Sequence, residues 1–386
     1  MTRNPGVPRL LRRLNDRAAL ELLLSEGPLT RAELGERTGL SKVTAGQLLS
    51  RLEERGLVEV AGERAGGRGP SAALYGVVPS SAHVAGLEVL PESITVGVAD
   101  ITGRIVVEVL VDPADGTDPV TTVHDAVLRA CASAMITMPQ LRSLVIGTRG
   151  VVDPATGDVR FSYDLPAWHA GVLASLRTTL GASVAIENDV NLVALAEHRH
   201  GAAAGLDDFV VIWTGVGQGL GVMLGGRLHR GISGGAGEIG WLPVPGEPLP
   251  ADVTQPQSGS YQRLVGQAAL DGLARRHGLS ARSSAELVRL AVAEGRGAFL
   301  DAVAARLAVG VAAVTVVLDP GLIVLAGDVG RAGGPELAAR VEEAVAKVCP
   351  SRPTVVTTGV AGNPVLRGAL VAALEQAREQ VFSDTV

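Results

Sequence analysis

The sequence contains only two cysteines in 386 residues, Cys131 and Cys349, and they lie far apart. Two thiols at this spacing exclude a disulfide framework and a cysteine-rich zinc site. Such sparse use of cysteine is typical of reduced thiols inside cells. The N-terminus shows no charged segment followed by an apolar stretch and a cleavage site, so no secretory signal is predicted. We therefore expect a cytoplasmic protein.

Aromatic residues and long apolar runs are also scarce. Aromatics make up 3% of the chain and hydrophobic residues 47%. We therefore expect a core of Ala, Val and Leu, which suits helices packed on buried strands. The longest apolar run covers residues 307–318. This run is shorter than the roughly 18–20 residues that span a bilayer, so no membrane span is predicted. The chain length predicts two or three domains of roughly 100–200 residues each.

The net charge of −6 is divided unevenly along the chain. Residues 1–80 contain 12 Arg and Lys against 9 Asp and Glu, and the remainder contains 22 against 31. A basic first part joined to an acidic remainder indicates an anionic partner for the first part alone.

Residues 15–39 carry the signals of two short helices. Apolar residues recur at helical spacing over residues 15–25 and are followed by a Gly-Pro break. The next helix is predicted to begin after Thr30, because Glu33 three positions later completes a capping box. Gly39 marks the end of this helix.

A third helix is predicted to follow Ser41 and to end at Gly56. Its apolar residues fall on one face and are Ala45, Leu48, Leu49 and Leu52. Two helices joined by a glycine turn are typical of a helix-turn-helix, whose second helix enters the major groove of DNA. The polar residues at the start of this helix are the candidates for base and phosphate contacts: Ser41, Lys42, Thr44 and Gln47.

Two short strands, at residues 57–60 and 74–78, flank a tip rich in glycine and arginine. Arg64 and Arg68 at this tip are candidates for contact with the minor groove or the backbone, as in a wing. Arg9, Arg12 and Arg13 are further phosphate candidates. The alternative is a small helical domain that binds a protein. The order of the signals favours a winged helix-turn-helix DNA-binding domain over residues 1–80.

Beyond residue 84, short apolar strands alternate with helices. Strand, strand and helix begin each half, which predicts a duplicated α/β fold with a cleft between two lobes. Four segments carry recognisable motifs: residues 145–157 (VIGTRGVVDPATG), 186–197 (IENDVNLVALAE), 214–231 (TGVGQGLGVMLGGRLHRG) with 237–240 (GEIG), and 323–330 (IVLAGDVG). Together with the N-terminal domain they resemble the ROK family of repressors and sugar kinases.

The resemblance implies an actin/hexokinase-like body that holds ATP and a sugar between its lobes. Residues 81–200 are then the first lobe, residues 201–364 the second, and a helix over residues 365–386 returns to the first. Asp189 matches the catalytic base of the family, while Asn188 and Glu238 match ligands of sugar hydroxyls. An amide and two carboxylates are suited to bind neighbouring hydroxyls. The alternative for Asn188 and Asp189 is a helix cap.

The chain departs from the family at the first ATP phosphate motif, an Asp-x-Gly-Gly-Thr segment. Residues 88–92 occupy the position of this segment. Leu90 adds a side chain where the backbone must approach phosphate. Pro91 removes an N–H donor, and Glu92 adds negative charge. We therefore expect no kinase activity, no ATP binding and a vestigial role for Asp189. The second phosphate motif, residues 214–221, is retained, although a tight glycine turn explains it equally well.

The structural zinc site of the family is also missing its ligands. Trp241 stands at the position of a histidine, and Val253, Gln255 and Ser260 stand at the positions of cysteines. None of these side chains replaces imidazole or thiolate as a zinc ligand. We expect no metal and no cofactor, and a loop that is either packed or mobile. Gln262 replaces a glutamate that also contacts sugar in the family.

These features predict a DNA-binding transcriptional regulator of carbohydrate-related genes, most simply a repressor. The expected partners are a double-stranded DNA operator, a small carbohydrate in the cleft and a second copy of the chain. A homodimer would place two N-terminal domains on adjacent half-sites. Two alternatives stay open: a regulator whose cleft binds no sugar, and an ATP-dependent sugar kinase.

Overall fold

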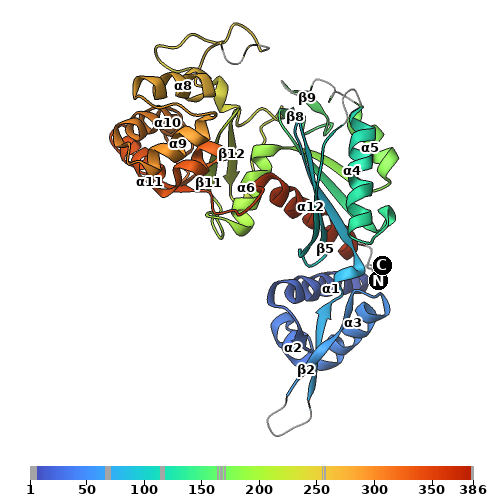
Figure 1. The fold of residues 1–386 in the computed structure, drawn as a ribbon. Coiled ribbons are helices and arrows are strands. Elements are labelled where there is room, and N and C mark those ends of the chain that lie inside the picture. The colour runs from blue at the N-terminus through green and yellow to red at the C-terminus, as the bar shows by residue number, and fades with distance from the viewer. Residues whose placement is uncertain are drawn as a thin grey trace, which may run out of the picture.

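A computed structural model describes residues 7–65, 71–113, 118–162, 165, 168, 171–253, 255 and 258–383. A small N-terminal domain lies against a two-lobed body (Figure 1). The predicted fold class is therefore confirmed: a winged helix-turn-helix precedes a two-lobed α/β body.

The N-terminal domain consists of three helices and a three-stranded antiparallel sheet. The helices are α1 (Val7–Glu26), α2 (Arg31–Thr38) and α3 (Lys42–Glu54). The strands are β1 (Leu29–Thr30), β2 (Val58–Arg64) and β3 (Ala72–Val77), in the order β1-β3-β2. The long hairpin of β2 and β3 projects beyond the helices as a wing (Figure 1).

Local capping fixes where α2 ends and α3 begins. The predicted capping box is present, with Thr30 Oγ1 accepting from the N–H of Glu33 at 3.3 Å and the N–H of Thr30 donating to Glu33 Oε2 at 2.9 Å. Gly39 ends α2 in the left-handed region with φ of 71°, where a side chain is disfavoured. Ser41 caps α3 by accepting from the N–H of Thr44. The predicted apolar face of α3 is fully buried.

The first lobe contains a five-stranded sheet in the order β10-β7-β4-β5-β6. Its strands are β4 (His83–Val89), β5 (Ile94–Asp100), β6 (Ile105–Val111), β7 (Leu141–Thr148) and β10 (Ser183–Asn188). Helices α4 (Pro119–Ser133) and α5 (Val172–Leu180) cover one face, and α12 (Pro364–Ser383) packs on the other beside α6 (Asp189–His200). A small hairpin, β8 (Val151–Val152) and β9 (Val159–Phe161), extends from β7.

The second lobe repeats this strand topology. Its sheet has the order β13-β12-β11-β14-β15, with strands β11 (Phe209–Thr214), β12 (Gln218–Leu224), β13 (Arg227–Leu228), β14 (Leu322–Ala326) and β15 (Thr354–Thr357). In both sheets the first strand is central, two antiparallel strands lie on one side and two parallel strands on the other. The helices are α7 (Gln262–Val265), α8 (Gln267–Arg276), α9 (Ser284–Ala293), α10 (Gly297–Leu318) and α11 (Gly327–Ala346).

Helix α10 is longer and more apolar than the sequence analysis indicated. Its 22 residues are sufficient in length and composition to cross a membrane. The apolar run at residues 307–318 is shorter than the helix, because Asp301 and Arg306 interrupt the apolar pattern without ending the helix. Half of its most apolar window is buried within the second lobe, where α10 packs against α11.

Two chain crossings join the lobes, and the carboxylate of Glu197 holds both. Glu197 is 0% exposed at the end of α6. It accepts from the N–H of Ala202 at 2.8 Å, from the N–H of Gly359 at 3.2 Å and from the hydroxyl of Thr358. The first contact lies at the exit from α6 and the other two lie between β15 and α12. Glu197 therefore links the two crossings through hydrogen bonds of one carboxylate.

Helix α12 connects the cleft region with the N-terminal domain (Figure 1). Near the cleft, Asn363 accepts from the N–H of Leu366 at 3.0 Å and donates to Glu88 Oε2 at 2.5 Å. Near the other end, Arg17 of α1 pairs with Glu379 at 2.7 Å. The helix thus contacts both the lobe that carries the cleft and the first helix of the DNA-binding domain.

Candidate functional site

The exposed face of α3 lies in a shallow groove with a positive charge. The groove is lined by Arg12, Arg31, Lys42, Val43, Gly46, Gln47, Ser50, Arg51 and Glu54. Four cations against one carboxylate suit the phosphates that flank a recognition helix in the major groove. Arg51 is held in place by an ion pair with the buried Asp16 at 2.6 Å.

The predicted DNA-contact residues occupy different environments. Lys42 and Gln47 are exposed in the groove. Ser41 and Thr44 are engaged with each other, since their hydroxyl oxygens lie 2.9 Å apart and Ser41 also caps the helix. Arg64 pairs with Glu33 of the capping box, and Arg68 lies outside the described residues. Of the predicted set, the structure brings Lys42 and Gln47 together on the recognition face.

Val43 was missed by the sequence analysis, which considered only polar residues. Its side chain is 70% exposed and lines the groove. An exposed apolar side chain on a recognition helix is suited to contact the methyl group of thymine.

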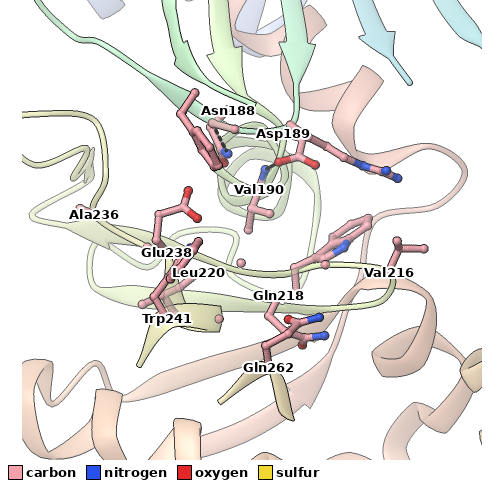
Figure 2. A pocket seen from close by; sticks show the side chains of 18 of the residues that line it. Asn188, Asp189, Val190, Val216, Gln218, Leu220, Ala236, Glu238, Trp241 and Gln262 are labelled. Atoms are coloured by element: carbon pink, nitrogen blue, oxygen red, sulfur yellow. Dashed lines mark hydrogen bonds between the residues drawn. The ribbon is translucent and has the colours of Figure 1, made fainter. Parts of the chain in front are cut away.

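The second candidate site is a cavity of about 280 Å³ between the two lobes. One wall comes from the first lobe, at the ends of β7 and β10 and the start of α6. The other wall comes from β11, β12, residues 234–241 and the start of α7 and α11 in the second lobe. Figure 2 shows Asn188 and Asp189 on one side and Glu238, Trp241, Gln218 and Gln262 on the other.

Asn188 is the cap of α6 as well as a cavity residue. Its Oδ1 accepts from the N–H of Asn191 at 3.1 Å, and its Nδ2 donates to the carbonyl of Gly150 at 3.0 Å. The alternative interpretation as a helix cap therefore holds for Asn188. Since one cap is sufficient, Asp189 is not needed for this purpose.

Asp189 is the first residue of α6 and its side chain is half-buried at the cavity wall. Burial raises its pKa to about 7, while the N–H of Val190, at 2.8 Å from Oδ1, and the charge of Arg149 oppose this shift. The nearby carboxylates of Glu88 and Glu238 raise the pKa further. A carboxyl group that titrates near neutral pH is able both to accept and to donate hydrogen bonds.

Glu238 faces Asp189 from the second lobe (Figure 2). Burial raises the pKa of Glu238, and a hydrogen bond from Trp241 opposes the shift. The backbone before Glu238 approaches β12 closely, because a Cβ on Gly237 would lie 2.0 Å from the carbonyl oxygen of Leu220. With φ of 104°, this position requires glycine, which explains the Gly-Glu pair of the motif.

The glycine loop at residues 215–217 is folded onto itself. The N–H of Gly215 donates to the carbonyl of Gly217 at 3.1 Å, and Gln218 Nε2 donates to the carbonyl of Gly215 at 3.4 Å. The indole of Trp213 covers the loop, since its Nε1 lies 3.3 Å from where a Cβ on Gly215 would be. Neither Trp213 nor Gln218 was recognised in the sequence, although both lie within or beside the third motif.

Two further charged residues line the cavity and were missed. Arg149 lies within the first quoted motif, and Asp328 lies within the fourth, in the first turn of α11. Asp328 Oδ2 lies 3.7 Å from the Cβ position of Gly215, beside Trp213. The motifs contained both residues, but only the fold shows that they face the same cavity as Asp189.

The loop that would bind zinc in the family is held by hydrogen bonds in its described part. The N–H of Ser260 donates to the carbonyl of Pro248 at 2.7 Å, and Arg263 pairs with Glu247 at 3.0 Å. Trp241 lines the cavity, Val253 is 63% exposed, and Ser260 is buried. These residues do not fit a zinc ion. No group of three or more His, Cys, Asp or Glu that could hold a metal occurs among the described residues.

Comparison with known proteins assigns both parts of the chain. The ROK family model matches residues 84–376, and a MarR family model matches residues 13–69. The chain therefore belongs to the ROK family, and its N-terminal domain is of the MarR winged-helix type.

Two curated relatives are transcriptional regulators. The DNA-binding transcriptional dual regulator NagC of Escherichia coli K12 is 24% identical over 266 residues, which are 68% of this chain and 64% of NagC. The xylose repressor of Bacillus subtilis is 26% identical over 240 residues, which are 61% of each chain. The matches thus span less than two thirds of the length of these relatives.

Solved structures match the fold over different shares of the chain. A ROK family transcriptional regulator, described as a homologue of the E. coli MLC protein, superposes with a TM-score of 0.75 at 17% identity and covers 96% of this chain and 98% of its own. The ROK hexokinase of Thermus thermophilus superposes with a TM-score of 0.62 at 27% identity. The match covers 76% of this chain and 98% of the hexokinase.

Proposed function

We propose that this protein is a DNA-binding transcriptional regulator, most simply a repressor, of carbohydrate-related genes, and that a carbohydrate in the interlobe cavity controls it. One observation carries the proposal. A cationic recognition face is joined through α12 to a lobe whose cavity presents Asn188, Asp189 and Glu238. The names of the two curated relatives support a regulatory role.

The DNA partner follows from the charge and shape of the α3 groove. Lys42 and Gln47 are exposed where a recognition helix contacts base edges, and Arg12 and Arg31 flank them as phosphate contacts. Since Arg64 pairs with Glu33, its contact with DNA requires that this ion pair open.

The carbohydrate partner follows from the chemistry of the cavity. Carboxylates at Asp189 and Glu238 and the amide of Asn188 offer acceptors and donors to neighbouring hydroxyls. The remaining walls are largely apolar and include Trp213 and Trp241. A few polar groups in an otherwise apolar cavity are typical of a specific small-molecule site.

Phosphoryl transfer is not part of the proposal. At the tip between β4 and β5, the N–H groups of Leu90 and Ser93 donate to each other's carbonyls at 2.9 and 3.4 Å, so neither is directed at a phosphate. The loop at residues 215–217 is closed by Trp213 and Gln218, and the carboxylate of Asp328 lies beside it. Negative charge at this point repels a polyphosphate.

A sugar kinase remains the second candidate. The likeness to the T. thermophilus hexokinase and the raised pKa of Asp189, which suits a general base, favour it. A coupled assay for ADP release with a panel of hexoses tests this candidate. We expect no turnover above background, whereas turnover that Asp189→Asn abolishes would establish the kinase.

A homodimer is proposed because two recognition helices on one operator need a fixed spacing. The C-terminal end of α10 offers an apolar surface, with Val316 67% and Val317 78% exposed. Sedimentation of the full chain should show a dimer that Val316→Glu weakens.

The decisive experiment measures binding of the purified protein to its own promoter and to random DNA, with and without sugars. We expect a preference for the promoter at moderate salt and a change in affinity with at least one sugar. Absence of a promoter preference would refute the regulator. Calorimetry with the same panel separates the alternatives, since no heat with any sugar would identify a regulator whose cavity binds none.

A further inference from the structure

The interlobe cavity contains an unusual share of the aromatic residues of this chain. The sequence has 3 tryptophans, 4 phenylalanines and 3 tyrosines. Two of the tryptophans, Trp213 and Trp241, and one phenylalanine, Phe161, line this cavity, while Trp168 is buried in the core of the first lobe. In a chain so poor in aromatics, this concentration points to a ligand with flat apolar faces.

Of the two tryptophans that line the cavity, Trp241 lies beside Glu238, to which it donates a hydrogen bond, and Trp213 lies at the glycine loop. Asn188 and Asp189 lie on the wall of the first lobe. Trp213 and Val216 lie at the glycine loop of the second lobe, and Val216 is 60% exposed at its tip. One end of the cavity thus offers hydrogen bonds to hydroxyls, and the end at residues 213–218 offers an indole face and an apolar rim.

An unpaired acceptor lies at the aromatic end. The amide of Gln218 donates through Nε2 to the carbonyl of Gly215, which fixes its orientation. Its Oε1 is buried and has no hydrogen-bond partner among the described residues. A buried acceptor without a partner is costly, so a movement of the Gln218 side chain that exposes Oε1 to a ligand hydroxyl would gain affinity.

This end of the cavity is closed to phosphate but open to a neutral ring. The N–H of Gly215 is bonded within the loop, and Asp328 Oδ2 lies 3.7 Å from the Cβ position of Gly215. A polyphosphate would meet a carboxylate and find this donor occupied. A neutral ring would instead stack on the indole of Trp213.

We infer that the end of the cavity at residues 213–218 is a subsite for a second ring, so that the ligand is a two-ring glycoside rather than a free monosaccharide. This inference rests on the proposed carbohydrate binding. The first ring binds at Asn188, Asp189 and Glu238, and the second stacks on Trp213. The second ring is either another sugar or an aromatic group, since both have an apolar face that stacks on an indole.

The test is calorimetry of the full-length protein with four sugars: glucose, galactose, xylose and N-acetylglucosamine. Each is supplied as the methyl glycoside, as the phenyl glycoside and as a disaccharide that carries it at one end. We expect at least one phenyl glycoside or disaccharide to bind about tenfold more tightly than its methyl glycoside. A higher affinity for the disaccharide alone would identify a sugar as the second ring. A higher affinity for the phenyl glycoside alone would identify an aromatic group.

Two variants connect this gain to the subsite. Trp213→Leu should lower the affinity for the two-ring ligand about tenfold more than the affinity for the methyl glycoside, so that the gain is lost. Val216→Ser, at a position that is 60% exposed, should reduce the gain without affecting the fold. Val106→Ser, on β6 and outside the cavity, is the control, and its affinities should be unchanged.

Two outcomes overturn the inference, and they are distinguishable. Equal affinity for methyl glycosides and two-ring ligands, or an equal loss for both in Trp213→Leu, would eliminate the second subsite while carbohydrate binding stands. Absence of binding to any of the compounds would refute the proposed carbohydrate function itself, and the subsite with it.

Discussion

The α3 groove and the interlobe cavity are opposite in charge, shape and origin. The groove is open, carries four cations against one acid, and comes entirely from the first 54 residues. The cavity is lined by Asp189, Glu238 and Asp328 against Arg149, and it needs residues from both lobes. A polyanion is attracted to the first and repelled by the second. Each surface therefore has its own determinants, and substitutions should separate DNA binding from ligand binding.

The largest expected effect is on the DNA side. Lys42→Glu should lower promoter affinity about 100-fold, because it replaces a phosphate or base contact with a like charge on the recognition face. Fluorescence anisotropy with promoter DNA measures the change, and carbohydrate binding should be unaffected. The only other lysine of the chain is Lys347, which is exposed on the second lobe, so Lys347→Glu is the matched control. Equal losses in both variants would show that net charge alone is responsible.

On the cavity side, Asp189→Asn should weaken carbohydrate binding by about 2 kcal/mol, or roughly thirtyfold. The reason is that hydrogen bonds to a charged group contribute about 1.5–3 kcal/mol. Affinity for promoter DNA without ligand should stay within twofold of wild type. Asp125→Asn on the exposed face of α4 serves as the control. A loss of DNA affinity equal to the loss of ligand affinity would show that the two sites are not separable.

The same residue predicts a dependence of stability on pH. Since the pKa of Asp189 is raised from 3.8 to about 7, the folded state binds more protons than the unfolded state between these pH values. Stability of the wild type should therefore fall as pH rises from about 4 to about 7 and level off above. Asp189→Asn has no carboxyl group at this position, so its stability should not fall in this way as pH rises. It should be more stable than wild type by about 1–2 kcal/mol at pH 8 and equal to it near pH 4, because the side chain is only half-buried. Urea unfolding at both pH values measures the difference, and a constant difference would contradict the raised pKa.

A smaller effect separates structure from recognition within the DNA-binding domain. Ser41 caps α3 and bonds to Thr44, so Ser41→Ala should lower the free energy of unfolding by about 1 kcal/mol. Its effect on promoter preference should be smaller than that of Gln47→Ala, which leaves the cap intact. Competition with random DNA measures the preference. The reverse ranking would place Ser41 at the bases.

The smallest effect is expected where the two regions are joined. Arg17→Ala removes an exposed ion pair between α1 and Glu379 of α12, and such pairs contribute about 0–1 kcal/mol. We expect each separate affinity to change less than twofold. The ligand-induced change in DNA affinity should fall about two- to threefold, and Glu379→Ala should reproduce this. No change in either variant would indicate that the signal passes elsewhere.

The N-terminal domain was predictable because its signals are local. Thr30 and Glu33 cap α2 from three positions apart, and Ser41 caps α3 just before its apolar face. Hydrogen bonds of this kind join residues a few positions apart, so the sequence pattern predicts them directly. The pairing of Arg64 with Glu33 was not predicted, because it depends on how the wing packs beside α2.

The cavity was predictable only in part. The Asn188-Asp189 pair was found because the motif at residues 186–197 resembles the ROK family, and the structure places the pair where β10 turns into α6. Trp213 and Trp241 come from two separate segments of the second lobe and Phe161 comes from the first lobe, so only the fold places all three at one cavity. The retained glycine motif fitted a phosphate loop and a tight glycine turn equally well. The contacts of Trp213 and Gln218 with the loop could not be predicted, because glycine spacing does not record them.

Helix α12 packs backbone to backbone on the first lobe. A Cβ on Gly86 of β4 would lie 2.8 Å from the backbone N of Leu370, and one on Gly368 would lie 1.9 Å from the carbonyl of Leu192 in α6. So close a fit leaves α12 no room to slide on the first lobe, so the two would move together as one lever if the lobes close about the crossings at Glu197. At about 1.5 Å per residue, the 20 residues of α12 give this lever a length of about 30 Å. Closure of the lobes by about 10° would then carry the recognition helix about 5 Å, more than one base step of about 3.4 Å.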